Sequence, residues 1–386
     1  MTGAASYEVL VPPPADGSTR ARLGRLTLPH GQVETPQFMP VGTNATVKAL
    51  HPDEVAAAGA TIVLANTYHL YLRPGHERIR DLGGLHHFMG WDRPILTDSG
   101  GYQVVSLGDL RVIDDGGVTF KSHLDGSTHR FTPEHSIAVQ EALGPDIAVA
   151  FDQPVFPSSP RREVEDAMHR THRWAERSLA AHTRTDQALF GIVQGGLDPE
   201  LREESARFIA SLPFDGINIG GLAGDETPEQ RNATLDVTVS FLEGDARPRY
   251  LMGLGSPLDL LEAVHRGVDL FDSVLPARVA RNGQLWIPGE RINLRNERFK
   301  DDPRPVQEGC PCPLCTRFSR AYLSHLFRAK EMLAYRLATC HNLTFTLDFM
   351  ARIRVAIRAG TFPDQLDELR SRAVRMSGGE VAGKRA

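Results

Sequence analysis

The stretch DIAVAFDQ (146–153) is followed, after a segment of helical period, by LFGIVQGG (189–196). Both are short apolar runs that end in polar or glycine residues, a pattern typical of strands buried on both faces of a parallel sheet. Six more runs of this kind occur along the chain. They are QFMPVG (37–42), TIVLANT (61–67), PILTDSGG (94–101), GINIGGLAG (216–224), RYLMGLG (249–255) and LFDSVLPAR (270–278).

Segments with the period of an amphipathic helix separate most of these runs, and several begin with Pro, Asp, Ser or Thr, as helix N-termini do. Eight strands alternating with helices predict an α/β fold, a (β/α)8 TIM barrel, over residues 36–278. Alternating patterns around the turns DDGG and DGS predict an inserted antiparallel hairpin at about 104–131. We expect residues 1–35 to form a β cap on the barrel floor and residues 279–386 to form a separate C-terminal subdomain with terminal helices.

The composition is that of an ordinary globular protein. Of the 386 residues, 41% are hydrophobic and 24% are charged, which excludes disordered and fibrous classes. No stretch reaches the ~18 apolar residues of a membrane span, and the N-terminus lacks a signal-peptide pattern. The sequence therefore predicts a cytoplasmic protein without a membrane segment.

Charge is distributed unevenly along the chain. The net charge is −5, but residues 278–336 carry twelve Lys/Arg against six Asp/Glu. The tail from residue 337 adds eight basic against five acidic residues, which leaves residues 1–277 at −14. An acidic body with a basic C-terminal third indicates either a docking surface for a polyanion or simply a solvated charged face.

All four cysteines lie in the C-terminal third, at 310, 312, 315 and 340. Clustering of this kind is unlike a secreted disulfide framework and points to a metal. Cys310, Cys312 and Cys315 lie within six residues and can converge on one tetrahedral zinc ion. Spacing leaves the fourth ligand open between the neighbours Cys340 and His341. We expect one structural zinc per chain that fixes the basic segment onto the barrel.

Polar residues recur at the C-terminal ends of the predicted strands, where TIM barrels place their chemistry. A single Asp after a strand commonly caps a helix, but three carboxylates that converge on one cavity repel and desolvate one another. We therefore interpret these positions as a functional site. The residues are Asp98, Asp152, Gln194, Gly220–Gly221, Met252–Gly253 and Asp272.

Several motifs together resemble the tRNA-guanine transglycosylases, the queuine/preQ1 tRNA-ribosyltransferases, in the family's order and over nearly the whole chain. They are TDSGGYQ (97–103), FDQP (151–154), GIVQGG (191–196), IGGLAG (219–224), YLMGLG (250–255), FDSVLPARVARNG (271–283) and the C-x-C-x2-C…H cluster. The resemblance implies a homodimer that replaces the wobble guanine (position 34) of GUN-anticodon tRNAs (Asp, Asn, His, Tyr) with a 7-deazaguanine base, preQ1 or queuine. It also favours His341 as the fourth zinc ligand and implies that residues 279–386 form a zinc-binding, tRNA-contacting subdomain.

The resemblance further implies roles for individual residues. Base exchange with retention at C1′ requires two displacements through a covalent ribosyl-enzyme, and hence a nucleophilic carboxylate and an acid/base group. Asp272 matches the family's nucleophile and Asp98 its acid/base group. The remaining matches are Asp152, Gln194 and Gly221 for hydrogen bonds to the base, Tyr102 and Met252 for the sandwich around its ring, and Arg278 and Arg281 for tRNA.

Three departures from the family pattern bear on the incoming base. The usual bacterial FDEC is FDQP here, so Pro154 replaces a pocket-lining cysteine. The usual GGLAVGE is GGLAGDE, so Gly224 replaces a valine of the pocket wall. Ser273 and Ala277 are mild changes in FDSVLPAR. A base pocket that is wider at this wall predicts that queuine is accepted as well as or better than preQ1, unless loop shifts refill the space.

Other functions fit the sequence less well. A (β/α)8 glycoside hydrolase also uses paired carboxylates, but it needs no zinc-bearing basic appendage. A non-catalytic RNA-binding subunit of the same family is expected to lack the nucleophile or the acid, and both are present. The archaeal-type relative that modifies another tRNA position is expected to carry further C-terminal RNA-binding domains.

Overall fold

Eight short parallel strands form the centre of the structure, a computed structural model that describes residues 4–106, 111–156 and 158–377. The strand order in the sheet is β4-β14-β13-β12-β11-β10-β6-β5. A parallel bridge between Val41, just after β4, and Leu64, within β5, closes the barrel. The strands are β4 (Gln37–Pro40), β5 (Val63–Ala65), β6 (Ile95–Thr97), β10 (Ile147–Val149), β11 (Ala188–Val193), β12 (Gly216–Ile219), β13 (Arg249–Leu251) and β14 (Leu270–Ser273).

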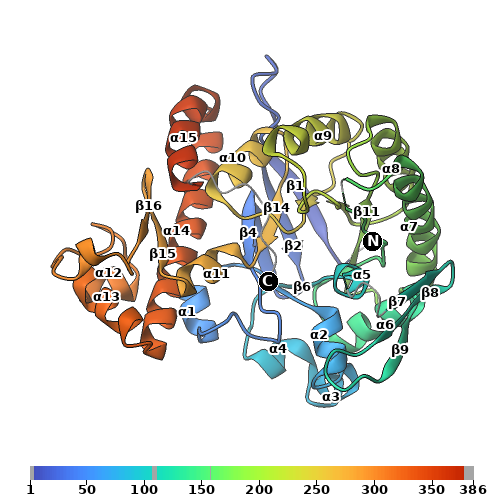
Figure 1. The fold of residues 1–386 in the computed structure, drawn as a ribbon. Helices are drawn as coiled ribbons and strands as arrows, with labels where there is room; N and C mark the ends of the chain where they lie inside the picture. Colours follow the sequence, from blue (N-terminus) through green and yellow to red (C-terminus); the bar gives the residue numbers. More distant parts are fainter. Residues whose placement is uncertain (1–3, 107–110, 157, 378–386) are drawn as a thin grey trace.

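Helices surround this barrel (Figure 1). Thr132, Asp198, Thr227 and Ser256 each accept a backbone N–H at a helix start and are followed by proline, which confirms the N-terminal signals in the sequence. The helices are α1 (Pro52–Ala57), α2 (Thr67–Leu72), α3 (His76–Asp81), α4 (Gly84–Met89), α5 (Gly101–Val105), α6 (Pro133–Leu143), α7 (Arg161–Ala181), α8 (Pro199–Ser211), α9 (Pro228–Ser240), α10 (Pro257–His265) and α11 (Leu275–Arg281).

The predicted insertion is a three-stranded antiparallel sheet of β7 (Arg111–Asp114), β8 (Gly117–Lys121) and β9 (Thr128–Phe131). Residues 107–110 of the predicted segment lie outside the described residues. A second antiparallel sheet comprises β1 (Ser6–Val11), β2 (Leu23–Leu28) and β3 (Gly31–Thr35). Its Leu26, Leu28 and Val33 belong to the apolar cluster that also holds barrel residues such as Phe190 and Leu270, so this sheet covers the barrel floor.

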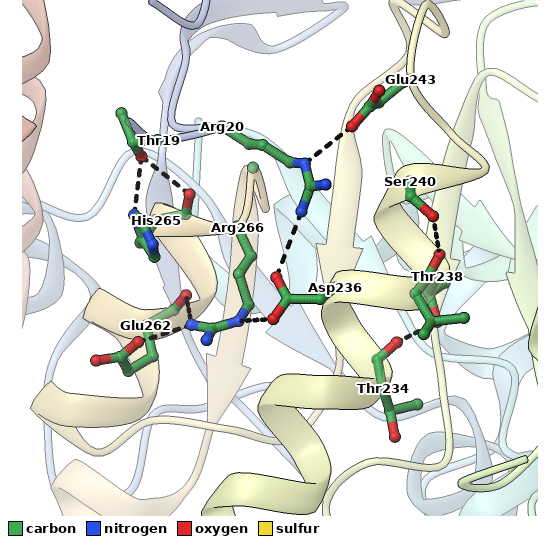
Figure 2. A network of polar contacts seen from close by, with 12 residues as sticks. Thr19, Arg20, Thr234, Asp236, Thr238, Ser240, Glu243, Glu262, His265 and Arg266 are labelled. Carbon is green, nitrogen blue, oxygen red and sulfur yellow. Dashed lines mark hydrogen bonds and ion pairs between the residues drawn. The ribbon is translucent and has the colours of Figure 1, made fainter. Parts of the chain in front are cut away.

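An ion-pair network fastens the segment between β1 and β2 to the outer helices (Figure 2). The Arg20 guanidinium contacts Glu243 at 2.9 Å and Asp236 at 3.4 Å. Arg266 contacts the other oxygen of Asp236 at 3.2 Å. Because these residues are partly exposed, the network orients the segment more than it stabilises the fold.

The C-terminal third packs on one side of the barrel (Figure 1). Its 27-residue helix α14 (Met332–Arg358) contacts α11 and β4 and has a mostly buried middle. The other elements are β15 (Gln284–Ile287), β16 (Glu290–Asn293), the 3-10 turn η2 (Glu297–Phe299), α12 (Pro313–Arg317), α13 (Arg320–Arg328) and α15 (Phe362–Ser377). The predicted domain boundaries at residues 35/36 and 278/279 stay predictions.

A bilayer-spanning helix is absent from the described part of the chain, since none of its helices is both long enough and apolar enough.

Candidate active site and metal centre

A cavity of about 600 Å³ opens at the C-terminal ends of the barrel strands. It lies where barrel enzymes of this architecture place their chemistry. Arg281, which lies one turn beyond Arg278 on α11, does not line it. The predicted site residues that do line it are Asp98, Tyr102, Asp152, Pro154, Gln194, Gly221, Gly224, Met252, Asp272 and Arg278.

Asp98 follows β6 and is buried against the start of α2. Asn66 donates to Oδ2, the Thr67 N–H donates to Oδ1 at 2.8 Å, and Gln103 donates to Oδ2 at 3.0 Å. Burial raises the pKa of the Asp98 carboxyl to about 6, these hydrogen bonds oppose the rise, and the charge of Asp272 adds to it. A carboxyl with a pKa near 6 can both give and take a proton close to neutral pH.

Asp272 lies on β14, across the cavity mouth from β6. The Tyr250 hydroxyl donates to its Oδ1 at 2.6 Å, and the Gly253 N–H donates to the same oxygen at 2.7 Å. Burial raises the pKa of Asp272, while both hydrogen bonds favour the ionised form. The side chain is thus fixed through one oxygen, and Oδ2 is left for chemistry.

Asp152 and Gln194 form a polar pair at the ends of β10 and β11. Gln194 Nε2 donates to Asp152 Oδ2 at 2.8 Å, and Ser99 Oγ donates to Oδ1 at 3.0 Å. Burial raises the pKa of Asp152 to about 6. Gln194 Oε1 is buried without a hydrogen-bond partner among the described residues. Because an unsatisfied buried acceptor is costly, this oxygen indicates a position where a ligand N–H would bind.

Gly221 must be glycine at this place. Its φ is +71°, and an added Cβ would lie 2.7 Å from the unpartnered Gln194 oxygen. The chain after β12 therefore approaches the polar pair with its backbone alone. A carboxylate, an amide and bare backbone on one side of a cavity can read the donor and acceptor edge of a planar base.

Tyr102 on α5 and Met252 after β13 line the same cavity. The Tyr102 side chain is 60% exposed, which is unusual for an aromatic residue beside buried carboxylates. An exposed ring and a polarisable thioether suit stacking on the faces of a planar ligand.

Two loops form the wall around Pro154 and Gly224. Ser158 bonds to the Asp225 carboxylate through both its N–H and its hydroxyl, and so joins the loops. The Gly224 N–H donates to Glu226 at 2.9 Å, and Glu226 pairs with the buried Arg231 at 3.1 Å. The wall segment that carries Gly224 is thus fixed to the start of α9.

The predicted metal ligands converge in the C-terminal third. Cys310, Cys312 and Cys315 place Sγ at 3.7, 3.5 and 3.3 Å from Nδ1 of His341. Tetrahedral zinc with usual bond lengths separates a thiolate sulfur from an imidazole nitrogen by about 3.6 Å, so these four residues could hold a metal ion. His341 Nε2 donates to the Trp286 carbonyl at 2.8 Å, the outer hydrogen bond common for metal-binding histidines. Cys340, although buried, is not part of this group.

Comparison with known proteins covers almost the entire chain. A profile of the family described as "Queuine tRNA-ribosyltransferase" matches residues 16–374. The chain belongs to this family.

Curated relatives called queuine tRNA-ribosyltransferase are closely similar. The protein from Moorella thermoacetica is 57% identical over 89% of this chain and 92% of its own. The protein from Herpetosiphon aurantiacus is 54% identical over 93% of this chain and 91% of its own. The protein from Thermus thermophilus is 55% identical over 89% of this chain and 89% of its own. The eight-stranded barrel confirms the fold predicted from the alternation of strands and helices. The profile match and these relatives confirm the family and the enzyme class, a transferase, predicted from the motifs.

Sequence reasoning missed three residues that contact the predicted site carboxyls in this member of the family. Asn66 is the first polar residue after the apolar part of the run TIVLANT, and this polar strand end was a signal for a site residue. Gln103 follows the quoted Tyr102, but nothing in the sequence indicates that it reaches back to Asp98. Tyr250 reads as a core residue of its strand, and only the structure reveals its bond to Asp272.

Proposed function

We propose that this chain exchanges guanine-34 of GUN-anticodon tRNAs for preQ1 or queuine through a covalent ribosyl-enzyme. The observation that carries the proposal is the pair of carboxyls that line one cavity at the ends of strands β6 and β14, the buried Asp98 and the half-buried Asp272. The match to the family profile and the close similarity to proteins called queuine tRNA-ribosyltransferase support the same activity.

The first half-reaction forms the covalent intermediate. Asp272 Oδ2 attacks C1′ of the ribose, and the electron pair of the C1′–N bond leaves with guanine. Asp98 gives its proton to the departing base. The ester between Asp272 and C1′ then holds the tRNA while guanine is replaced in the pocket.

The second half-reaction reverses these roles. The nitrogen of the incoming base attacks C1′, the ester bond breaks, and Asp272 is released as a carboxylate. Asp98 takes the proton from the incoming nitrogen and is ready for the next cycle. Two displacements at one carbon retain its configuration, and no cofactor takes part in either step.

The other site residues bind rather than react. We assign Asp152, Gln194 and the Gly221 backbone to the base edge, and the unpartnered Gln194 oxygen supports this assignment. Tyr102 and Met252 would sandwich the ring. Arg278 and Arg281, both on α11, would contact the tRNA phosphates beside the exchanged nucleotide.

The metal centre has a structural role in this proposal. One zinc ion would be held by Cys310, Cys312, Cys315 and His341, whose geometry suits a closed tetrahedral site. It would pin the loop before α12 to helix α14 and thereby position the basic C-terminal third. A homodimer in the cytoplasm, where tRNA is modified, completes the proposal.

A base-incorporation assay tests the function. The protein is incubated with unmodified tRNA and either preQ1 or queuine, and the digested nucleosides are analysed by mass spectrometry. We expect loss of guanosine from position 34 and gain of the supplied base only in GUN-anticodon tRNAs. The proposal would be overturned if the protein incorporated neither preQ1 nor queuine and did not exchange labelled free guanine into the tRNA.

A further inference from the structure

A second group of metal-ligating side chains lies at the opposite end of the barrel from the cavity. Asp146 directly precedes β10 and is buried, His30 lies in the turn between β2 and β3, and His86 lies on α4. The three residues come from distant parts of the sequence. Their ligand atoms nevertheless lie within 4.8 Å of one another.

The two imidazole rings share one carboxylate. His30 Nδ1 lies 2.9 Å from Asp146 Oδ1, and His86 Nε2 lies 3.0 Å from Oδ2. The rings are stacked, with centroids 3.6 Å apart and an interplanar angle of 18°.

The spacing also suits a metal ion. With bonds of about 2.1 Å, two ligands at right angles are about 3 Å apart, which matches both nitrogen–oxygen distances. Two imidazoles and one carboxylate are ligands that divalent first-row transition metals favour.

The surroundings support ligand binding. The N–H groups of His30 and Ile95 donate to the Asp146 carboxylate at 3.0 and 2.8 Å, and they would orient it as outer hydrogen bonds do in metal sites. The His30 side chain is 42% exposed, which gives an ion access from solvent. The nearby Arg184 directs its guanidinium to Asp186 and a backbone carbonyl, so it does not occupy the carboxylate.

We propose that His30, His86 and Asp146 bind a divalent first-row transition-metal ion that clips the β1–β3 sheet and α4 to the barrel floor. Water would complete the coordination sphere. The clip is structural, because the proposed chemistry takes place at the other end of the strands. It would add to the apolar contacts and to the buried Arg22–Asp269 ion pair that already join the sheet to the barrel floor.

Zinc titration by calorimetry tests this site. The protein is first dialysed against a mild chelator, so that only tightly held thiolate-bound metal remains. We expect one further equivalent of Zn²⁺ to bind with a dissociation constant in the micromolar range or tighter, and the melting temperature to rise by several degrees. Absence of a further equivalent, or binding only at millimolar zinc, would overturn the proposal.

A double variant distinguishes ligation from hydrogen bonding. In His30→Asn with His86→Gln, each amide N–H lies near the replaced ring nitrogen and can still donate to Asp146, but an amide nitrogen is not a metal ligand. The variant should fold, keep base exchange without added metal, and lose the extra equivalent. His169→Gln, which alters the separate pair with Glu204 at 2.8 Å, is the matched control and should bind zinc as the parent does. Unchanged zinc binding in the double variant would refute the assignment.

Discussion

Asp98 is a buried carboxyl whose ionisation costs stability. Its pKa is raised to about 6 in the folded protein, above its ordinary value near 4. Its contribution to the free energy of unfolding is therefore fully present below pH 4 and is lost as the pH rises through 6. Asp98→Asn removes this titration. We expect the stability of the variant relative to the parent to rise by on the order of 3 kcal/mol between pH 4 and pH 8. Denaturant unfolding at several pH values measures this, and a pH-independent difference would contradict it.

Gly224 belongs to the wall that limits the group on C7 of the incoming base. Queuine carries a bulky cyclopentenediol there, whereas preQ1 carries a small aminomethyl group. Gly224→Val adds three carbons to this wall and should shift selectivity toward preQ1 by about tenfold or more, since a pocket discriminates by about 1–3 kcal/mol per methylene. Competition between the two bases on one tRNA gives the ratio. If the parent ignores saturating queuine but incorporates preQ1, the wider-pocket interpretation is wrong.

Among the elements, the loop before α12 would depend on α14 for the fourth ligand of the proposed zinc ion. Cys312→Ser should lower the zinc content from about one per chain after mild chelation, and it should weaken stability and tRNA binding together, because a structural metal is coupled to folding. Metal analysis measures the zinc content, thermal unfolding measures the stability, and a binding assay measures the affinity for tRNA. A metal-free preparation with full thermal stability would count against a structural zinc.

The neighbouring residues on α14 provide an internal control for the same site. His341 faces the three thiolates, whereas Cys340 lies outside the ligand group. His341→Ala should therefore reduce zinc content far more than Cys340→Ser. The reverse result would make Cys340 the fourth ligand.

The eight barrel strands were predictable because each is a short apolar run with a polar end. The helices α2 to α5 were not predicted, since they are only five or six residues long and carry too few turns for a hydrophobic period to appear. The carboxyl residues of the site followed from strand ends. Their partners did not, because Asn66 and Tyr250 reach Asp98 and Asp272 from other strands, and contacts of that kind leave no local signal in a single sequence.

At the scale of the whole molecule, the acidic body and the basic C-terminal third predict that tRNA binds by its phosphates on one side. Arg278→Ala should weaken binding of all GUN-anticodon tRNAs alike and reduce the slope of log K against log salt by roughly 0.7–0.9. Arg207→Ala, on the exposed face of α8 beside Glu203, is the control and should leave the slope unchanged. An effect confined to one tRNA would indicate contact with a base instead of a phosphate.

Asp272 is proposed to carry the ribosyl group during base exchange, and peptide mapping of the trapped adduct decides whether it does. The protein is mixed with tRNA, quenched in denaturant and digested, and the modified peptide is sequenced by mass spectrometry. We predict an adduct that survives denaturing gels, maps to Asp272 and is missing in Asp272→Asn, although that variant still binds tRNA. An ester on Asp98, or an adduct that persists in Asp272→Asn, would contradict the account.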